Sequence, residues 1–401
     1  MDYQYITTQE DFARFLEIIE NVSWIGYDTE FISEGHYRAK LCLLQVATET
    51  GYYLLDPLSI PDLTPFWERV CRDDTLSIVH ACRSELEFCF RAVKRLPQRI
   101  FDVQLAAAFV GLGYPLNFKS LANETIKVTL EKAETLTDWK HRPLLDSQLS
   151  YALNDVCHLR KIANFLIEKL HTMKRMEWFE EEMQDYCREL KEAFTEERWR
   201  KILGARAYTP NELTIIRDLW RWRDEKALAK NVAPARIMRD DVILNLARLG
   251  VYVREQIEVM RGVNPQFVQE ICFTIRGALE TPEEDKPRQN LAFYPVYKLA
   301  TQLVGVLLAQ YCQTKGISYQ VVTTLSDIRQ AIAYHEHKIK SHEVSQVRLL
   351  SGWRSVFLGD FLNNVLSGHY AMQLNDRRLD EEPLKLVDLR GSRSKAVRFD
   401  R

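Results

Sequence analysis

Short apolar runs and helical periods alternate along the first 170 residues of the chain. The opening segment YITTQEDFARFLEII predicts a strand followed by a helix, and four further apolar runs predict strands: WIGYDTEF, KLCLLQVAT, GYYLLDP and TLSIVHA. Helical periodicity follows at 85–93, 103–109 and 148–166. Because strands come early and helices late, we expect an α/β domain with a mixed sheet and flanking helices.

The strand pattern ends near residue 175, and the rest of the chain is predicted to be all-α. FEEEMQDYCRELKEAF is typical of a charged helical connector, and Thr209-Pro210-Asn211-Glu212 carries the signals of a helix start. ETPEEDKPRQ, at 280–289, predicts a linker. The chain is therefore divided into an α/β domain (1–172), a connector (173–205), a first helical domain (206–280), a linker (281–291), a second helical domain (292–378) and a basic C-terminal tail (379–401).

Composition places the chain among ordinary globular proteins, with 401 residues, 46% of them hydrophobic and 27% charged. Its eight cysteines are scattered without a Cys-x-x-Cys pair, which fits a reducing cytoplasm. The N-terminal segment lacks an apolar core, and the apolar run at 303–309 is too short to span a bilayer. We therefore expect neither secretion nor insertion into a membrane.

The average charge conceals a basic segment in the middle of the chain. The net charge is −2, yet residues 198–239 contain eleven Lys or Arg against four acids, a net of +7. Such a segment can bind nucleic acid, although a solvated helix face is the simpler explanation of a charge run.

Two carboxylates stand one residue apart in the predicted strand WIGYDTEF. Asp28 and Glu30 project from the same face, whereas Ile25, Tyr27 and Thr29 point to the other face. Close carboxylates repel one another and are costly to bury unless a cation lies between them. Either the strand ends in solvent at this point, or these acids bind a divalent metal.

A second constellation favours the metal. In QLSYALNDVCHL, Tyr151 and Asp155 are four residues apart on a helical pattern, so the phenol and the carboxylate share one face. Hard oxygen ligands from a strand and a helix can together hold Mg²⁺ or Mn²⁺. Two such ions, about 3.5–4 Å apart, would clamp a phosphodiester, and a phenol beside them can orient the attacking water.

Five segments resemble, in order, the exonuclease motifs of the ribonuclease D family: DTEF at 28–31, HACRSELEFCF at 80–90, FDVQLAAAFVGLGYPLNFKSLA at 101–122, TDWKHRPL at 137–144 and YALND at 151–155. The stretch from YTPNELTIIRDLW to VILNLARLG resembles the helicase-and-RNase-D C-terminal (HRDC) domain, and LLSGWRSVFLGDFL is similar to the second, divergent HRDC copy of that family. The resemblance implies a ribonuclease H-like mixed sheet with flanking helices, followed by two all-α HRDC-type domains.

The resemblance also implies the catalytic residues. Asp28, Glu30 and Asp155 would bind two divalent metal ions, Mg²⁺ or Mn²⁺, and Tyr151 would position the water. The remaining ligand of the family is an aspartate, and the aligned residue here is Glu85. Its extra methylene displaces the carboxylate by about 1.3 Å, and a misplacement of about 1 Å can cost on the order of a hundredfold in rate.

We expect Glu85 to serve as a ligand nonetheless. Glu87 and Asp102 are alternatives, although Asp102 also fits the cap of the next helix. Further candidates, for contact with the substrate, are Phe31, His80, Arg142, Arg221 and Arg236. A hydrogen-bonded histidine is the simpler explanation of His80, and a bracing role is the simpler explanation of Arg142.

The implied reaction is hydrolysis of the terminal phosphodiester at RNA 3′ ends, with release of nucleoside 5′-monophosphates. The implied substrates are precursor tRNA and other small structured RNAs, bound by a cytoplasmic monomer. Two alternatives remain open: a 3′–5′ exonuclease that acts on DNA, and a non-catalytic RNA-binding protein in which Glu85 has disabled the metal site.

Overall fold

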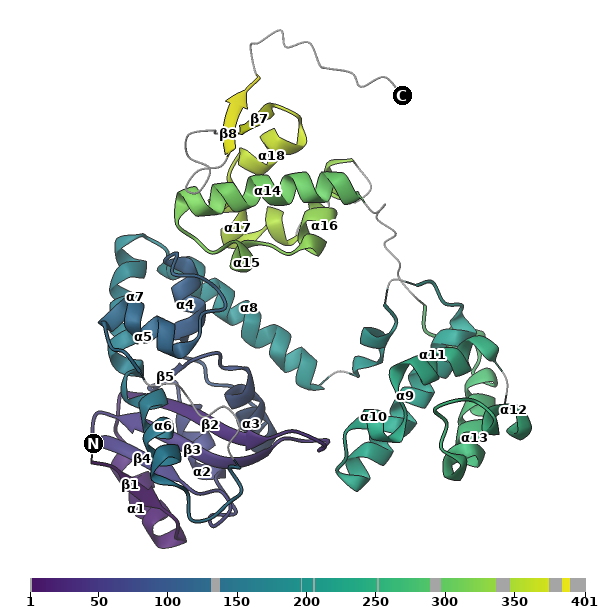
Figure 1. Ribbon diagram of the computed structural model, residues 1–401, viewed down its shortest axis with the longest axis horizontal. Coiled ribbons are helices and arrows are strands. Elements are labelled where there is room, and N and C mark those ends of the chain that lie inside the picture. Colours follow the sequence, from purple (N-terminus) through teal and green to yellow (C-terminus); the bar gives the residue numbers. More distant parts are fainter. Residues whose placement is uncertain are drawn as a thin grey trace.

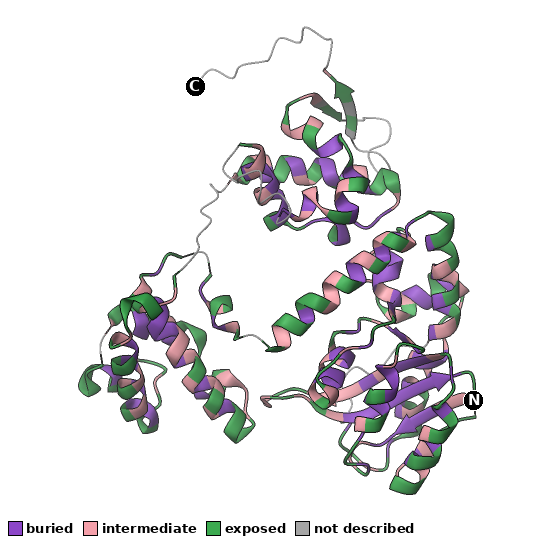
Figure 2. Cartoon of the chain, turned by 180° about the vertical axis from the view of Figure 1, so that it is seen from behind, coloured by how far each residue is buried: buried purple, intermediate pink, exposed green. Residues whose placement is uncertain are grey.

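The structure, a computed structural model, describes residues 2–130, 138–195, 197–204, 206–250, 252–288, 297–336, 347–374 and 384–389. An α/β domain lies at the N-terminal end, and a long helix leads from it to two helical domains (Figure 1). Figure 2 shows that buried residues concentrate along the strands and on the inner faces of the helices. Within the described residues, the helices include none that is long and apolar enough to cross a membrane.

Six strands form one mixed sheet in the order β1-β4-β3-β2-β5-β6. Strand β2 is antiparallel to β3 and parallel to β5, and β1 is parallel to β4. The five predicted strands are confirmed, whereas β6 was missed because three residues cannot establish an alternation. The strands are β1 (Gln4–Ile6), β2 (Trp24–Ile32), β3 (Lys40–Thr48), β4 (Gly51–Leu55), β5 (Leu76–Val79) and β6 (Ile100–Asp102).

Seven helices surround the sheet, so the predicted α/β class is confirmed. On one face of the sheet, Tyr27 of β2 packs edge-on against Phe66 and Trp67. On the other face, Ala152 and Leu153 join a second buried cluster. The helices are α1 (Gln9–Ile19), α2 (Thr64–Val70), α3 (Arg83–Val93), α4 (Val103–Phe109), α5 (Phe118–Ile126), α6 (Asp146–Cys157) and α7 (Leu159–Thr172).

The helix predicted at 148–166 is in fact two helices, α6 and α7, which meet at His158. No proline or glycine marks this break, so the apolar period continues through it and the sequence pattern does not reveal it. The break allows α6 to lie against β2, β3 and β4 while α7 packs on α4 and α5.

The segment predicted as a connector forms the 20-residue helix α8 (Met176–Thr195) and the short 3₁₀ helix η1 (Arg198–Ile202). One face of α8 is buried, with Phe179, Met183 and Leu190 in the same core as the α/β domain. This helix is therefore part of the α/β domain's packing as well as the route to the helical domains.

The first helical domain has a hydrophobic core of its own. Its leading helix begins with the predicted capping box: Thr209 Oγ1 accepts from the Glu212 amide, and the Glu212 carboxylate accepts from the Thr209 amide at 2.6 Å. The elements are α9 (Pro210–Lys230), α10 (Pro234–Ile237), α11 (Asp240–Leu249), α12 (Arg254–Glu258), η2 (Pro265–Phe267), α13 (Val268–Leu279) and η3 (Glu283–Asp285).

The second helical domain repeats the order of a long, a four-residue and a medium helix, but it is not all-α as predicted. Residues 370–374 and 384–388 pair as an antiparallel hairpin, so β8 occupies part of the segment predicted as a tail. The other parts of the predicted tail, 379–383 and 390–401, lie outside the described residues. The elements are α14 (Lys298–Lys315), α15 (Tyr319–Val322), α16 (Leu325–His335), η5 (Arg348–Leu350), α17 (Gly352–Leu358), α18 (Phe361–Leu366), β7 (Tyr370–Leu374) and β8 (Leu384–Asp388).

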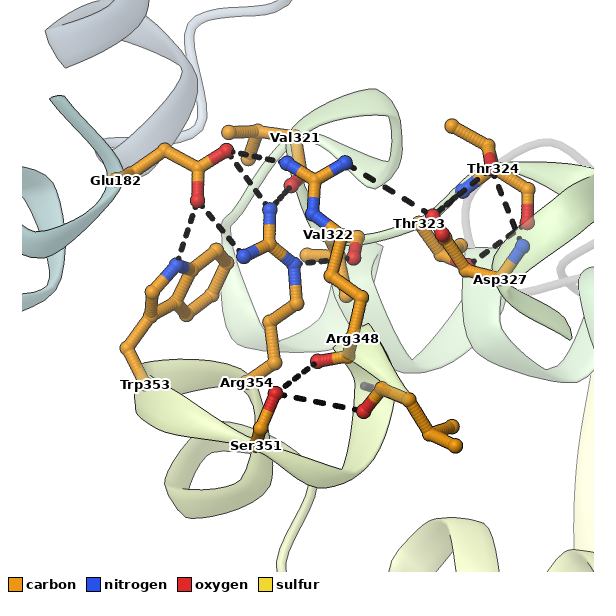
Figure 3. Close-up of polar contacts among 11 residues, drawn as sticks. Glu182, Val321, Val322, Thr323, Thr324, Asp327, Arg348, Ser351, Trp353 and Arg354 are labelled. Atoms are coloured by element: carbon orange, nitrogen blue, oxygen red, sulfur yellow. Dashed lines mark hydrogen bonds and ion pairs between the residues drawn. The ribbon is translucent and has the colours of Figure 1, made fainter. Parts of the chain in front are cut away.

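The second helical domain is docked on the α/β domain through buried polar contacts. Figure 3 shows the Glu182 carboxylate of α8 receiving hydrogen bonds from Arg348, Arg354 and the Trp353 indole. A second contact comes from Arg175, which precedes α8. Its guanidinium donates to the carbonyl oxygens of Phe109 in the α/β domain and Gly316 in the second helical domain, each at 2.6 Å. Both domains contribute to one hydrophobic cluster.

The first helical domain meets the α/β domain through the turn that follows β2. The Tyr37 hydroxyl donates to Asp224 Oδ2 at 2.5 Å, and the Ala233 amide donates to the Gly35 carbonyl oxygen at 3.2 Å. Arg236 lies beside the same turn, since a Cβ built at Gly35 would be 3.1 Å from its guanidinium nitrogen. This domain is thus held at the strand that carries Asp28 and Glu30.

Candidate active site

The topology of β2 opens the space in which the acidic residues meet. Strand β2 pairs with β5 at residues 24–26 and with β3 at residues 26–32, so its second half extends past the end of β5. Helix α3 begins at Arg83 beside that half and contacts β2. Helix α6 contacts β2 from the face that carries Asp28 and Glu30. Strand β2 and helices α3 and α6 therefore converge beside Asp28 and Glu30.

Four carboxyl groups from these elements interact with one another. Burial, followed by the charges of Asp28, Asp155 and Glu85, raises the pKa of Glu30 to about 9. Burial and the charge of Asp28 raise the pKa of Glu85 and that of Asp155 each to about 8. The pKa of Asp28 is also raised, chiefly by burial. Such values mean that burial and mutual repulsion outweigh the attraction of nearby cationic side chains.

Glu85 reaches the cluster despite its extra methylene. Its side chain is buried, and Oε1 accepts a hydrogen bond from Thr29 Oγ1 at 2.6 Å. The charge of Asp28 also raises the pKa of Glu85, so the two carboxyl groups lie close together. The bulge of the β2–β3 pairing between Glu30 and Phe31 lies at the same place, as is common beside active sites.

Tyr151 faces the cluster from α6. The pKa of its phenol is raised by burial and by the charges of Asp155, Glu30 and Asp28, which lie close to it. The ring packs against Trp139, with centroids 6.2 Å apart. The hydroxyl is therefore a protonated donor at neutral pH, in a position to hold a polar oxygen.

The donor set is chemically suited to a hard divalent cation. Carboxylate oxygens from one strand and two helices are the ligands that Mg²⁺ and Mn²⁺ prefer. In the described part of the chain, no group of three acidic, histidine or cysteine side chains already has the spacing of a finished metal site. Mutual repulsion keeps these carboxyl groups apart, and a bound cation that offset their charge would let them close up.

Two alternatives to Glu85 as a ligand take other roles. Asp102 is the cap of α4, where it accepts from the Gln104 and Leu105 amides, and it also accepts from the Cys82 amide at 2.9 Å. Glu87 lines a cavity between the α/β domain and the first helical domain.

The other candidates near the cluster are mostly engaged by the protein. His80 Nε2 lies 2.9 Å from the Leu116 carbonyl oxygen, which fits the hydrogen-bonded histidine. Arg142 makes two hydrogen bonds to Asp56, at 2.6 and 2.8 Å, and others to backbone carbonyls, which fits bracing rather than phosphate contact. The Phe31 ring packs on Phe88 at 5.6 Å and is only partly buried.

The two arginines of the basic segment lie at the boundary between domains. Arg221 is half-exposed, pairs with Glu197 at 2.7 Å, and lines a cavity of about 520 Å³ together with Arg38, Arg91 and Lys94. Arg236 is exposed beside Gly35. Neither arginine contacts the carboxylate cluster. Each could contact only the part of a substrate that extends beyond this cluster.

Thr29 is the residue that sequence reasoning missed. Strand alternation places it on the face opposite Asp28, yet its hydroxyl reaches Glu85 because α3 lies beside the free half of β2. The signal in the sequence was its position between two acids, which alone does not indicate a contact.

Comparison with known proteins matches two parts of the chain to family models. A model of 3′–5′ exonuclease domains matches residues 3–171, and a model of HRDC domains matches residues 212–272. Fold and acidic site thus define a 3′–5′ exonuclease, a class whose members use divalent metal ions, joined to an HRDC domain.

Curated relatives and a solved structure show which proteins the whole chain resembles. The ribonuclease D of Desulfotalea psychrophila is 28% identical over 368 residues, covering 89% of this chain and 96% of its own. That of Escherichia coli is 29% identical over 378 residues, covering 91% and 99%. The crystal structure of E. coli RNase D superposes with a TM-score of 0.77 at 27% identity, over 92% of this chain and 100% of that chain. The chain is therefore a 3′–5′ exoribonuclease that resembles ribonuclease D over almost its whole length.

Proposed function

We propose that the protein shortens structured RNAs from their 3′ ends by hydrolysing the terminal phosphodiester with the help of two divalent cations. The observation that carries this proposal is the meeting of Asp28, Glu30, Glu85 and Asp155, from three separate elements, with the Tyr151 phenol beside them. Buried carboxyl groups at such proximity are costly unless they serve a cation.

Each residue of the site has a role in this proposal. The four carboxylates would hold Mg²⁺ or Mn²⁺, which when bound supplies Lewis-acid stabilisation of the charge that develops on the attacking and leaving oxygens. Tyr151 holds the attacking water in line with the phosphorus through its hydroxyl. In this proposal Phe31, which is partly buried and follows Glu30 in β2, packs against the terminal nucleoside. The products would be nucleoside 5′-monophosphates.

Precursor tRNA and other small structured RNAs are the proposed substrates. The related E. coli enzyme is an exoribonuclease involved in structured RNA processing. The basic segment 198–239 runs through the first helical domain, where Arg221 and Arg236 lie outside the carboxylate cluster. Contact with the backbone and the 2′-hydroxyl would suit removal of nucleotides without regard to base identity. We also propose that residues 297–374 are a second, divergent HRDC copy.

The test is the release of mononucleotides from a hairpin RNA that carries a 3′ single-stranded extension, with Mg²⁺ or Mn²⁺ and with EDTA. We expect 5′-monophosphates to appear in a cation-dependent manner and degradation to stop near the hairpin. A DNA strand of the same sequence, mixed in equal amount, measures the preference for RNA. No product with either cation would overturn the proposal.

Glu85→Asp separates a working site from a decayed one. An active parent shows that glutamate serves at this position. A parent without activity that gains it through Glu85→Asp would instead indicate an RNA-binding protein whose site has decayed.

A further inference from the structure

The contact between Thr29 and Glu85 is a buried hydrogen bond at the centre of the carboxylate cluster. Thr29 Oγ1 donates to Glu85 Oε1 at 2.6 Å, and the two residues are only 6% and 4% exposed. At 2.6 Å this is a short hydrogen bond between two oxygen atoms. Because both side chains are buried, removal of the hydroxyl would leave this oxygen of Glu85 without its hydrogen-bond donor.

The position of Glu85 explains why such an anchor matters in this chain. Glu85 stands in the first turn of α3, and its side chain has one more rotatable bond than the aspartate of the family motif. An unanchored glutamate would sample several rotamers, and ordering it costs binding free energy. The Thr29 hydroxyl holds one oxygen of Glu85 in a place where the carboxyl group also interacts electrostatically with Asp28.

We propose that Thr29 is a positioning residue that sets the reach of Glu85, so that the longer side chain presents its carboxylate to the same cation as Asp28. This inference rests on the proposed function, because it takes the cluster to be the cation site. Thr29 contacts Glu85, the proposed cation ligand, and would not contact the substrate.

The test is Mn²⁺ binding without RNA, with free Mn²⁺ measured by electron paramagnetic resonance. Thr29→Val keeps the branched shape and removes the donor, so Mn²⁺ affinity should fall about tenfold. Thr29→Ser keeps the donor and should stay within about twofold of the parent. In a Glu85→Asp background, Thr29→Val should change affinity by less than about twofold, because no anchored glutamate is left to lose.

A matched control separates positioning from general destabilisation. Thr125 is also buried in the α/β domain and donates to the Leu121 carbonyl oxygen at 2.6 Å. Thr125→Val should leave Mn²⁺ affinity unchanged, and thermal unfolding should confirm that each variant is folded.

Three outcomes overturn the inference. One is parent-like affinity in Thr29→Val, and another is an equal loss in Thr29→Val with and without Glu85→Asp. In both cases Mn²⁺ binding by the parent leaves the proposed function standing. The third is a parent that binds no Mn²⁺, which overturns the inference and the proposed function together.

Discussion

Arg354 and Glu182 form a two-pronged ion pair across the boundary between the second helical domain and α8. The Arg354 Nη2 atom lies 2.8 Å from Glu182 Oε1, and Nη1 lies 2.7 Å from Oε2. Both side chains are nearly inaccessible, at 3% and 7% exposure. Burial alone would raise the pKa of Glu182, but hydrogen bonds and charge from Arg354 and Arg348 hold it below its usual range. The carboxylate is therefore ionised and fully paired (Figure 3).

Glu182→Ala should loosen the second helical domain. Removing one partner of a buried pair leaves the Arg354 charge uncompensated, which costs about 3–5 kcal/mol of unfolding free energy. Urea unfolding measures the loss, and small-angle scattering should show a larger radius of gyration. Asp185→Asn on the same helix removes an exposed pair with Arg188 and should cost less than about 1 kcal/mol. Equal losses in the two variants would contradict the prediction.

Gly111 should tolerate alanine less well than Gly113. Both have positive φ, at 79° and 112°, so both pay for a left-handed alanine, about 1–2 kcal/mol. A Cβ at Gly111 would also lie 2.8 Å from the Gly316 carbonyl oxygen, whereas a Cβ at Gly113 meets nothing within 4 Å. Gly111→Ala should therefore show the larger drop in melting temperature. If Gly113→Ala instead lowers the melting temperature more, the close approach of Gly111 to Gly316 does not limit stability.

Asp28→Asn and Asp155→Asn should each lower kcat by more than about a hundredfold, because each removes a charge from the proposed cation site. Release of 5′-monophosphates from the 3′-extended hairpin RNA is the assay. Glu87→Gln is the control, since Glu87 follows Glu85 on α3 but lines the neighbouring cavity, and activity should stay within about threefold of the parent. A large loss of activity in Glu87→Gln would indicate that Glu87 of α3 belongs to the cation site.

The metal-free protein should become less stable as the pH rises. Folding raises the pKa of Glu30 to about 9 and those of Glu85 and Asp155 to about 8, so the folded state binds protons more tightly than the unfolded chain. The stability that these bound protons contribute is complete below the ordinary pKa values of the carboxyl groups, about 4. It is lost as the pH rises through about 8–9, the pKa values in the folded state. Melting temperatures in EDTA should fall across that range.

Cation addition and a charge-removing variant complete this test. Mg²⁺ should stabilise the protein more at about pH 9 than at about pH 6, because it replaces bound protons. Asp155→Asn should flatten the dependence measured in EDTA. A melting temperature in EDTA that does not change over this range would show that the carboxyl groups are not coupled as the structure has them.

Local patterns in the sequence predicted the strands of the sheet and the capping box at Thr209, because both depend on residues near one another in the chain. The carboxylates were singled out by type and by resemblance, and the structure brings them together. The contact of Thr29 with Glu85 depends instead on where β5 ends, which no period in β2 reveals. Likewise, the buried face of α8 became visible only once its partners from two domains were in place.

The core shared by the α/β domain and the second helical domain makes remote parts of the chain one cooperative unit. Residues as distant as Phe109 and Trp353 pack together in it, with ring centroids 4.9 Å apart, while the first helical domain, between them in sequence, has a separate core. Denaturation should therefore proceed in two steps, and native-state hydrogen exchange should group α4 with α17 and set α9 apart. During synthesis, the packing of the α/β domain is therefore complete only after the second helical domain has been synthesised.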